Sequence, residues 1–223
     1  ISYAGLMYKG PHVPLKELIP KIKAFGYDGI EISAKRPFAF PPDLDAKARK
    51  KIVELAKSEG IEICAIAGYN NFSSPIMEEV ENELLMLREQ IRLASDLGAP
   101  IVRVFGAWKG VTIGPDGIAT WAFSRDKWNY PGTTDIKQWQ QIRSCLKEGC
   151  KWAEEFGVTL ALQTHGPVVE TPGYEDTLQM IKEVNSDYLK MSLDPAGWWA
   201  KQTPEYVRQA VKDCRDYIIH SHW

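Results

Sequence analysis

The sequence predicts an α/β protein of the (β/α)8 TIM-barrel class that ends after the seventh strand. Seven short β-rich runs alternate with amphipathic helical stretches at even spacing, which is typical of parallel β/α units. No glycine-rich phosphate-binding motif follows any of these runs, which argues against a nucleotide-binding fold. Polar residues instead recur at the carboxyl ends of many runs, the arrangement by which a barrel builds a site. An open doubly wound sheet is the alternative.

The strands predicted in the first half lie at residues 1–8, 29–33, 61–67 and 101–105. The helix after the first strand begins at Pro14, because apolar residues recur from there at helical spacing. The next helix ends at Gly60, a residue that suits a helix C-cap. The third begins at Ser74 and Pro75, since serine caps helices and proline fits their first position, and it ends at Gly98.

The second half repeats this alternation, with strands predicted at residues 158–162 and 189–193 and a seventh strand that begins at residue 217. The intervening helices are predicted from about Thr134 to Gly157, around residues 178–184, and from Thr203 onward. Each helix can therefore cross back over the sheet to the next parallel strand.

We expect one barrel domain over residues 1–223, although eight β/α units usually need about 250 residues. Ending after the seventh strand would leave the first and seventh strands with unpaired edges. Either an eighth unit is missing from this sequence or another chain covers the gap, and we favour the former. Association into a homo-oligomer remains an open alternative.

The composition limits the partners that the protein can have. The formal charge is −2 and no block of lysine and arginine occurs, so nucleic-acid binding is not expected. No apolar run approaches the about 20 residues that span a membrane, so no membrane partner is expected. The four cysteines form no CxxC pair and are interpreted as reduced, which fits a cytoplasmic protein. Because Ile1 already lies in a predicted strand, a secretory leader ahead of this sequence remains an open alternative.

Polar side chains stand where predicted strands run into the loops that follow them, and the candidates are Glu31, Arg103, Gln163, His165, Asp194, His220 and His222. Gln163 and His165 are two residues apart on an extended segment, so both can face one side. His220 and His222 have the same relation. An amide oxygen, a carboxylate and an imidazole from neighbouring strands could together bind a divalent cation.

Each candidate also has a structural interpretation. Glu31 could accept hydrogen bonds from a loop or pair with a cation, and Arg103 could be a structural ion-pair partner. His165 could be a packing residue, and Asp194 could form an Asx-turn ahead of Pro195. The alternate histidines at the seventh strand are the sharpest local signal, because such a pair rarely serves packing alone.

The segment from residue 106 to residue 132 is too long for an ordinary βα connection of about two to six residues. It carries several aromatic residues, among them Trp108, and Trp198 follows Asp194 by a few residues. Aromatic rings at a barrel mouth give flat apolar platforms that suit the C–H faces of sugars. A loop core packed on itself is the alternative.

The residues resemble the xylose-isomerase-like superfamily of sugar isomerases and epimerases over essentially the whole chain. The resemblance is carried by GYDGIEI (26–32), GIEI (60–63), LALQTH (160–165), LD (193–194) and IHSH (219–222). It implies a divalent ion, most often Mn²⁺ and sometimes Mg²⁺, Co²⁺ or Zn²⁺, held by residues from strands five to eight. Asp194 and His222 match that pattern, whereas Gln163 replaces the strand-five glutamate and the strand-eight glutamate lies outside this sequence.

The resemblance implies a metal-dependent isomerase or epimerase of a keto sugar, acting through an enediolate. In such epimerases two glutamates exchange the proton, but an amide cannot act as a base, so His165 becomes the candidate base, with Glu31 second. The expected substrate contacts are Arg103, Trp108, His220 and Trp198.

Three other functions stay open on the same fold. A metal-assisted C-glycoside deglycosidase or lyase acting on 3-keto sugars comes second, and a non-catalytic sugar-binding barrel comes third. An endonuclease IV-like enzyme is less favoured, because such enzymes need three zinc ions and many histidines, and this chain has four.

Overall fold

The computed structural model describes residues 13–108, 112–113, 119–120, 132–164, 173–195 and 203–223. Six parallel strands form one curled sheet in the order β1-β2-β3-β6-β7-β8. Their bounds are β1 Gly29–Ser33, β2 Glu62–Ala67, β3 Ile101–Val104, β6 Thr159–Gln163, β7 Leu189–Leu193 and β8 Ile218–Ser221. The curled parallel sheet confirms a partial (β/α) barrel as the fold class.

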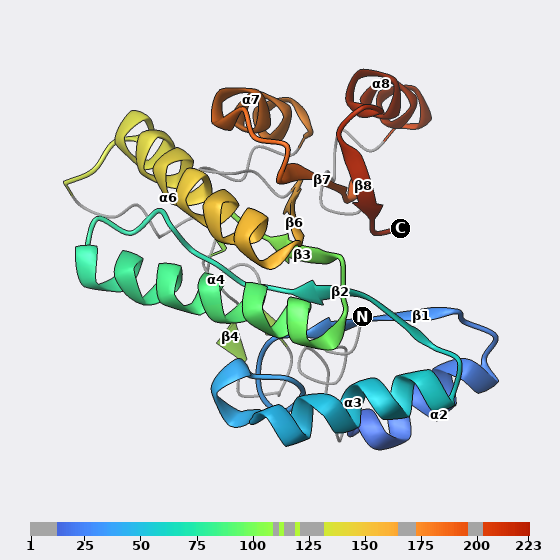
Figure 1. Cartoon of the computed structure of the whole chain (residues 1–223). Coiled ribbons are helices and arrows are strands. Elements are labelled where there is room, and N and C mark those ends of the chain that lie inside the picture. Colours follow the sequence, from blue (N-terminus) through green and yellow to red (C-terminus); the bar gives the residue numbers. More distant parts are fainter. Residues whose placement is uncertain (1–12, 109–111, 114–118, 121–131, 165–172, 196–202) are drawn as a thin grey trace.

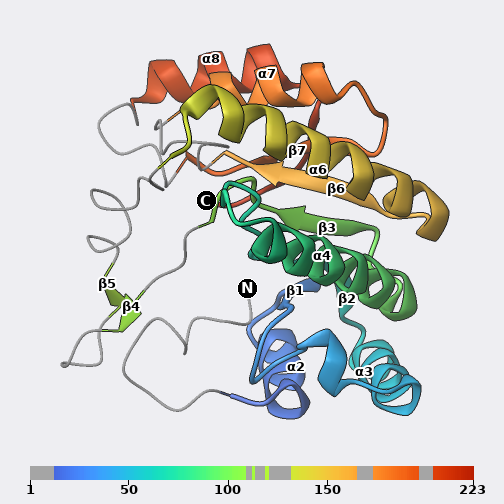
Figure 2. The same ribbon diagram turned by 90° about the vertical axis from the view of Figure 1, so that its left-hand side faces the viewer.

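The helices run along the outer face of this curled sheet (Figures 1 and 2). They are α2 Leu15–Ala24, α3 Ala46–Ser58, α4 Met77–Leu97, α6 Asp135–Phe156, α7 Glu175–Val184 and α8 Pro204–Cys214, with a 3-10 turn η1 at Pro41–Asp43. Helix α4 packs on β2 and β3, α6 on β6, and α7 on β6 and β7. Helices α4 and α7 therefore cover the strands on either side of their own crossovers.

Six of the seven predicted strands are confirmed, and the one predicted at residues 1–8 lies outside the described residues. The segment predicted as one long connection contains a short antiparallel pair, β4 Thr112–Ile113 with β5 Ala119–Thr120. The four cysteines are free, as interpreted from their spacing. None of the helices in the described part of the chain has the length and apolar character needed to span a bilayer.

Capping residues explain where the helices begin and end. Thr134 accepts a hydrogen bond from the Lys137 amide at 3.3 Å, so α6 begins where predicted. The start predicted for α4 is wrong by about two residues, because Ser74 is not its N-cap. The Ser74 hydroxyl instead accepts from the Ile76 amide at 3.1 Å and donates to Glu79, which makes a turn ahead of the helix.

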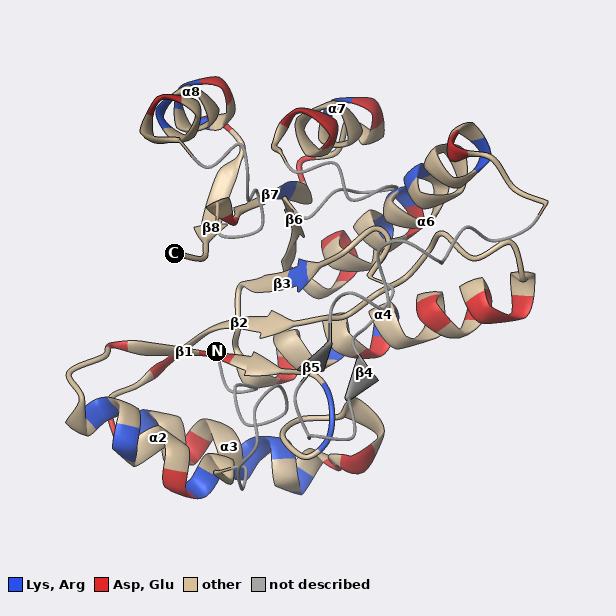
Figure 3. Ribbon diagram, turned by 180° about the vertical axis from the view of Figure 1, so that it is seen from behind, with Lys and Arg blue, Asp and Glu red and all other residues tan. Residues whose placement is uncertain are grey.

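The alternation of side chains along each strand separates an apolar outer face from a polar inner one. The outer positions join the buried core beneath the helices and include Ile30, Ile32, Val102, Val104, Leu160, Leu162, Met191 and Leu193. Charged residues lie mainly on the helices (Figure 3). The polar strand residues Glu31, Arg103 and Gln163 consequently point toward the barrel interior.

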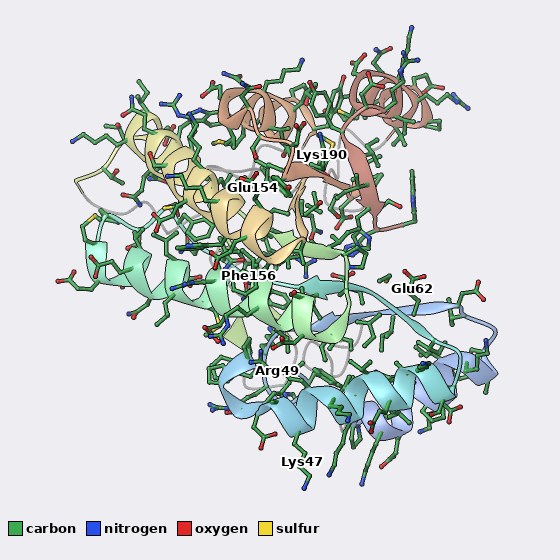
Figure 4. The ribbon with its side chains drawn as sticks, viewed as in Figure 1. Lys47, Arg49, Glu62, Glu154, Phe156 and Lys190 are labelled. Carbon is green, nitrogen blue, oxygen red and sulfur yellow. The ribbon has the colours of Figure 1, made fainter. Side chains whose placement is uncertain are left out.

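One buried arginine side chain lies in the outer layer of helices. On α3, Lys47 points away from the molecule, whereas Arg49 is buried (Figure 4). The Arg49 guanidinium donates to Asp96 of α4 at 2.5 Å and to the carbonyls of Leu44 and Pro41 at 3.0 and 3.1 Å. These contacts join α3 to α4 and have no connection to the strand ends.

Candidate functional site

Six polar side chains meet at the carboxyl ends of five strands, and they are Glu31, Arg103, Gln163, Asp194, His220 and His222. The structure therefore brings together six of the nine residues predicted for the site. Arg103 is 1 % exposed and Glu31 is 5 % exposed, although both carry charge. Charged groups at this depth need partners, and each finds them within the cluster.

Arg103 of β3 lies at the centre of the cluster. Its Nε donates to Glu31 Oε1 and its Nη1 donates to Gln163 Oε1, both at 2.8 Å. Because a guanidinium only donates, the Gln163 atom that faces it is the carbonyl oxygen. The Gln163 amide nitrogen therefore faces the other way, where it donates to Asp194 Oδ2 and lies 3.5 Å from His222 Nδ1.

Glu31 of β1 accepts hydrogen bonds from two histidines: His220, which lies in β8, and His222, which lies just after it. Its Oε2 lies 2.6 Å from His222 Nε2 and 3.2 Å from His220 Nε2. Burial acts to raise the pKa of Glu31, but the hydrogen bonds from His220 and His222 and the charge of Arg103 outweigh it. The pKa of Glu31 is thus held well below its ordinary value, and this carboxyl is ionised at neutral pH.

His222 lies between two carboxylates, since its Nε2 contacts Glu31 and its Nδ1 lies 3.5 Å from Asp194 Oδ2. Burial acts to lower the pKa of His222, but the bonds to Asp194 and Glu31 outweigh it and raise that pKa. A proton and a metal ion would compete for this imidazole.

Two groups of ligand atoms in the cluster could hold a divalent ion, and their spacing favours one of them. Ligand atoms of Glu31, His220 and His222 lie within 4.8 Å of one another, but the 2.6 Å contact inside this group is a hydrogen bond. Two ligands bound to one ion at about 2.1–2.2 Å lie roughly 3–3.5 Å apart. Asp194 Oδ2 and His222 Nδ1, at 3.5 Å, have that spacing.

Gln163, the third predicted ligand, reaches the same place with its amide nitrogen. Its oxygen could bind an ion there only if the amide turned over, which would set its NH₂ group against the Arg103 guanidinium. The spacing of the Asp194 and His222 ligand atoms therefore fits a divalent ion, but the Gln163 amide that now donates to Asp194 must turn over before the ion can bind.

An aromatic group borders the cluster on the side of β2 and β3. Trp108 stacks on Phe105 with ring centroids 4.7 Å apart, and Tyr69 lies 6.0 Å from Trp108. The Arg103 guanidinium lies 5.0 Å from the Tyr69 ring, and Lys35 Nζ lies 4.2 Å from it. Burial, and next the charge of Arg103, lower the pKa of Lys35.

Sequence reasoning missed Tyr69, Phe105 and Lys35 as neighbours of the site. All three follow the end of a strand, which is the signal that selected the other candidates. His165 and Trp198, predicted as base and substrate contact, lie outside the described residues.

Residues 19–223 match the family described as the xylose isomerase-like TIM barrel. The chain belongs to this family. Among curated proteins, fructoselysine 3-epimerase of Shigella flexneri is 28 % identical over 163 residues, which is 70 % of this chain and 51 % of that protein. The chain thus spans about half the length of the curated relatives it matches.

Solved structures of the family share the fold at low sequence identity. The Escherichia coli 3-keto-D-glucoside 4-epimerase has a TM-score of 0.71 and 18 % identity, covering 93 % of this chain and 73 % of that one. The probable 3-DHS dehydratase of Bacillus anthracis has a TM-score of 0.70 and 17 % identity, covering 98 % of this chain and 70 % of that one. At these identities the likeness shows the fold alone.

Proposed function

We propose that this chain belongs to a metal-dependent isomerase or epimerase that acts on a keto sugar or sugar derivative through an enediolate. The observation that carries the proposal is the pair of Asp194 and His222, whose ligand atoms lie 3.5 Å apart at the carboxyl ends of the strands. The 28 % identity to a fructoselysine 3-epimerase supports the reaction class. Mn²⁺ is the proposed ion, with Mg²⁺, Co²⁺ and Zn²⁺ as alternatives.

In this proposal Asp194 and His222 hold the ion, and Gln163 completes the set after its amide turns. When bound, such an ion supplies Lewis-acid stabilisation of the negative charge that develops on the substrate oxygen. His165 is the proposed base that removes the proton beside the carbonyl. An imidazole ordinarily has a pKa near neutrality, which suits that task.

The remaining residues are proposed to hold and orient the sugar. Trp108 and Trp198 would pack against its C–H faces, and His220 would accept a hydrogen bond from it through Nδ1, because its Nε2 donates to Glu31. Arg103 is also proposed as a substrate contact, and its 2.8 Å bonds to Glu31 and Gln163 fit the alternative of a structural ion pair. A small sugar is the proposed partner.

The reaction class is tested by proton exchange in D₂O. A keto sugar incubated with the protein and Mn²⁺ should gain one deuterium at the carbon beside its carbonyl, observed by NMR. Asp194→Asn, which removes one proposed ligand, should abolish this exchange. Exchange that persists after metal removal would reject the metal dependence, and exchange that never occurs would reject the isomerase.

Elimination by a lyase or C-deglycosidase is the second candidate, and Gln163 is the observation that favours it. An amide in place of a carboxylate leaves the site one base short of the two that epimerisation needs. Loss of a leaving group from the substrate in the same NMR experiment would identify this reaction. A protein that binds sugar but no metal would be the non-catalytic barrel.

Gln163→Glu should raise the affinity for Mn²⁺ by about 10–100-fold, because a carboxylate replaces a neutral amide beside Asp194 and His222. Isothermal titration calorimetry measures the change. Gln140→Glu on the exposed face of α6 adds the same charge away from the cluster and should leave the affinity unchanged. Equal affinities in the wild type and Gln163→Glu would remove Gln163 from the proposed ligands.

A further inference from the structure

Glu31 receives three hydrogen bonds, and their donors come from distant parts of the chain. Arg103 of β3 binds one carboxylate oxygen, while His220 and His222 bind the other. β1 and β8 stand at opposite ends of the described sheet. The contacts of Glu31 with the two histidines therefore cross the barrel interior instead of following the sheet.

The contact at His222 decides which ring nitrogen carries the proton. Arg103 can only donate, so it keeps Glu31 as an ionised carboxylate, which can only accept. The 2.6 Å contact therefore requires a hydrogen on His222 Nε2. A neutral imidazole carries one such hydrogen, so in the neutral form His222 Nδ1 holds the electron pair, 3.5 Å from both Asp194 Oδ2 and the Gln163 amide nitrogen.

We propose that Glu31 is a positioning residue that sets the tautomer of His222, with the hydrogen on Nε2 and the Nδ1 electron pair directed toward Asp194. Arg103 holds Glu31 in place for this purpose. The proposal rests on the proposed function in one respect only, which is that the electron pair is used to bind a divalent ion. Glu31 consequently acts through His222 and takes no proton from the sugar.

A direct test examines the wild-type protein and uses a variant only to assign the signal. The protein is labelled with ¹⁵N-histidine, stripped of metal and followed by NMR upward in pH until the imidazole signals stop changing, because the pKa of His222 is raised. His222→Gln identifies the signal of His222 by its disappearance. The expected spectrum is that of the Nε2–H tautomer, and an Nδ1–H tautomer would overturn the proposal.

Glu31→Gln should reverse that tautomer. Arg103 requires the amide oxygen of residue 31 to face it, so the NH₂ group must face His222. Two donors cannot share a hydrogen bond, so the His222 proton moves to Nδ1 and blocks the site. We expect the spectrum of the Nδ1–H tautomer. We also expect the Mn²⁺ affinity to fall by about 10–100-fold, the usual effect of removing the hydrogen-bond partner of a metal ligand.

Glu183→Gln is the matched control. Glu183 of α7 also accepts three hydrogen bonds, from Trp139, Arg143 and Gln179, but it lies on the outer layer. Its replacement should change neither the His222 tautomer nor the Mn²⁺ affinity. An unchanged tautomer in Glu31→Gln would overturn the proposal, whatever the metal affinity.

The two proposals fail in different ways. If the wild type binds no Mn²⁺ yet shows the Nε2–H tautomer, and Glu31→Gln reverses it, the metal-dependent function fails while the role of Glu31 stands. If Glu31→Gln does not fold, as judged by circular dichroism, the wild-type spectrum alone decides.

Discussion

Arg103→Met is expected to lower the free energy of unfolding by about 3–5 kcal/mol, the usual cost of removing one partner of a buried ion pair. Arg103 is 1 % exposed and its partner Glu31 is 5 % exposed, so the variant leaves a buried carboxylate with only the histidines to stabilise it. Gln163 Oε1 also loses its donor. Urea unfolding at pH 7, followed by tryptophan fluorescence, measures the difference.

Arg143→Met is the matched control for this variant. Arg143 donates to Glu183 at 2.9 Å, but both side chains are about one-third exposed, 36 % and 28 %. An ion pair of this kind contributes about 1 kcal/mol or less. A loss of similar size in both variants would mean that His220 and His222 are sufficient partners for Glu31.

The pH dependence gives a second check on the same pair. The folded pKa of Glu31 is lowered, so its contribution is fully present above the unfolded pKa and is lost as the pH falls through the folded pKa. The stability difference between the wild type and Arg103→Met should therefore narrow below about pH 4.3, the ordinary glutamate value. A difference independent of pH would show that the loss comes from packing.

The fold could be predicted from the sequence because burial leaves a regular pattern. Each of the strands β1, β2, β3, β6, β7 and β8 is a short β-rich run between amphipathic helices, and Gly157 marks a helix end through its left-handed φ of 67°. The pair of β4 and β5 escaped prediction because two-residue strands carry no periodicity. Ser74 was misassigned because a serine caps a turn as readily as it caps a helix.

The candidate site could be predicted as a set of residues but not as a set of contacts. Parallel strands bring their carboxyl ends to one edge, so Glu31, Gln163 and Asp194 had to approach one another. Which atom of Gln163 faces Asp194 depends on Arg103, 60 positions earlier in the chain. The contact of Glu31 with His222 spans 191 positions, and no local pattern encodes it.

His165→Gln is expected to reduce kcat by about 10²–10⁴, the usual cost of losing a positioned general base. Glutamine keeps a polar side chain of similar size but cannot accept the proton. Mn²⁺ affinity should stay near the wild-type value, because Asp194, His222 and Gln163 are untouched. Steady-state kinetics of the proposed isomerisation, together with calorimetric Mn²⁺ titration, measure the two quantities.

A rise in KM larger than the fall in kcat would instead make His165 a residue that orients the substrate. The pH profile separates the two roles independently, since an imidazole base gives kcat/KM a rising acid limb near about pH 6–7. A limb near about pH 4–5 would indicate a carboxylate base. Glu31 would not be that base, because its neighbours hold its pKa well below the ordinary glutamate value. Such a result would assign the proton transfer to a carboxylate other than Glu31, such as Glu170.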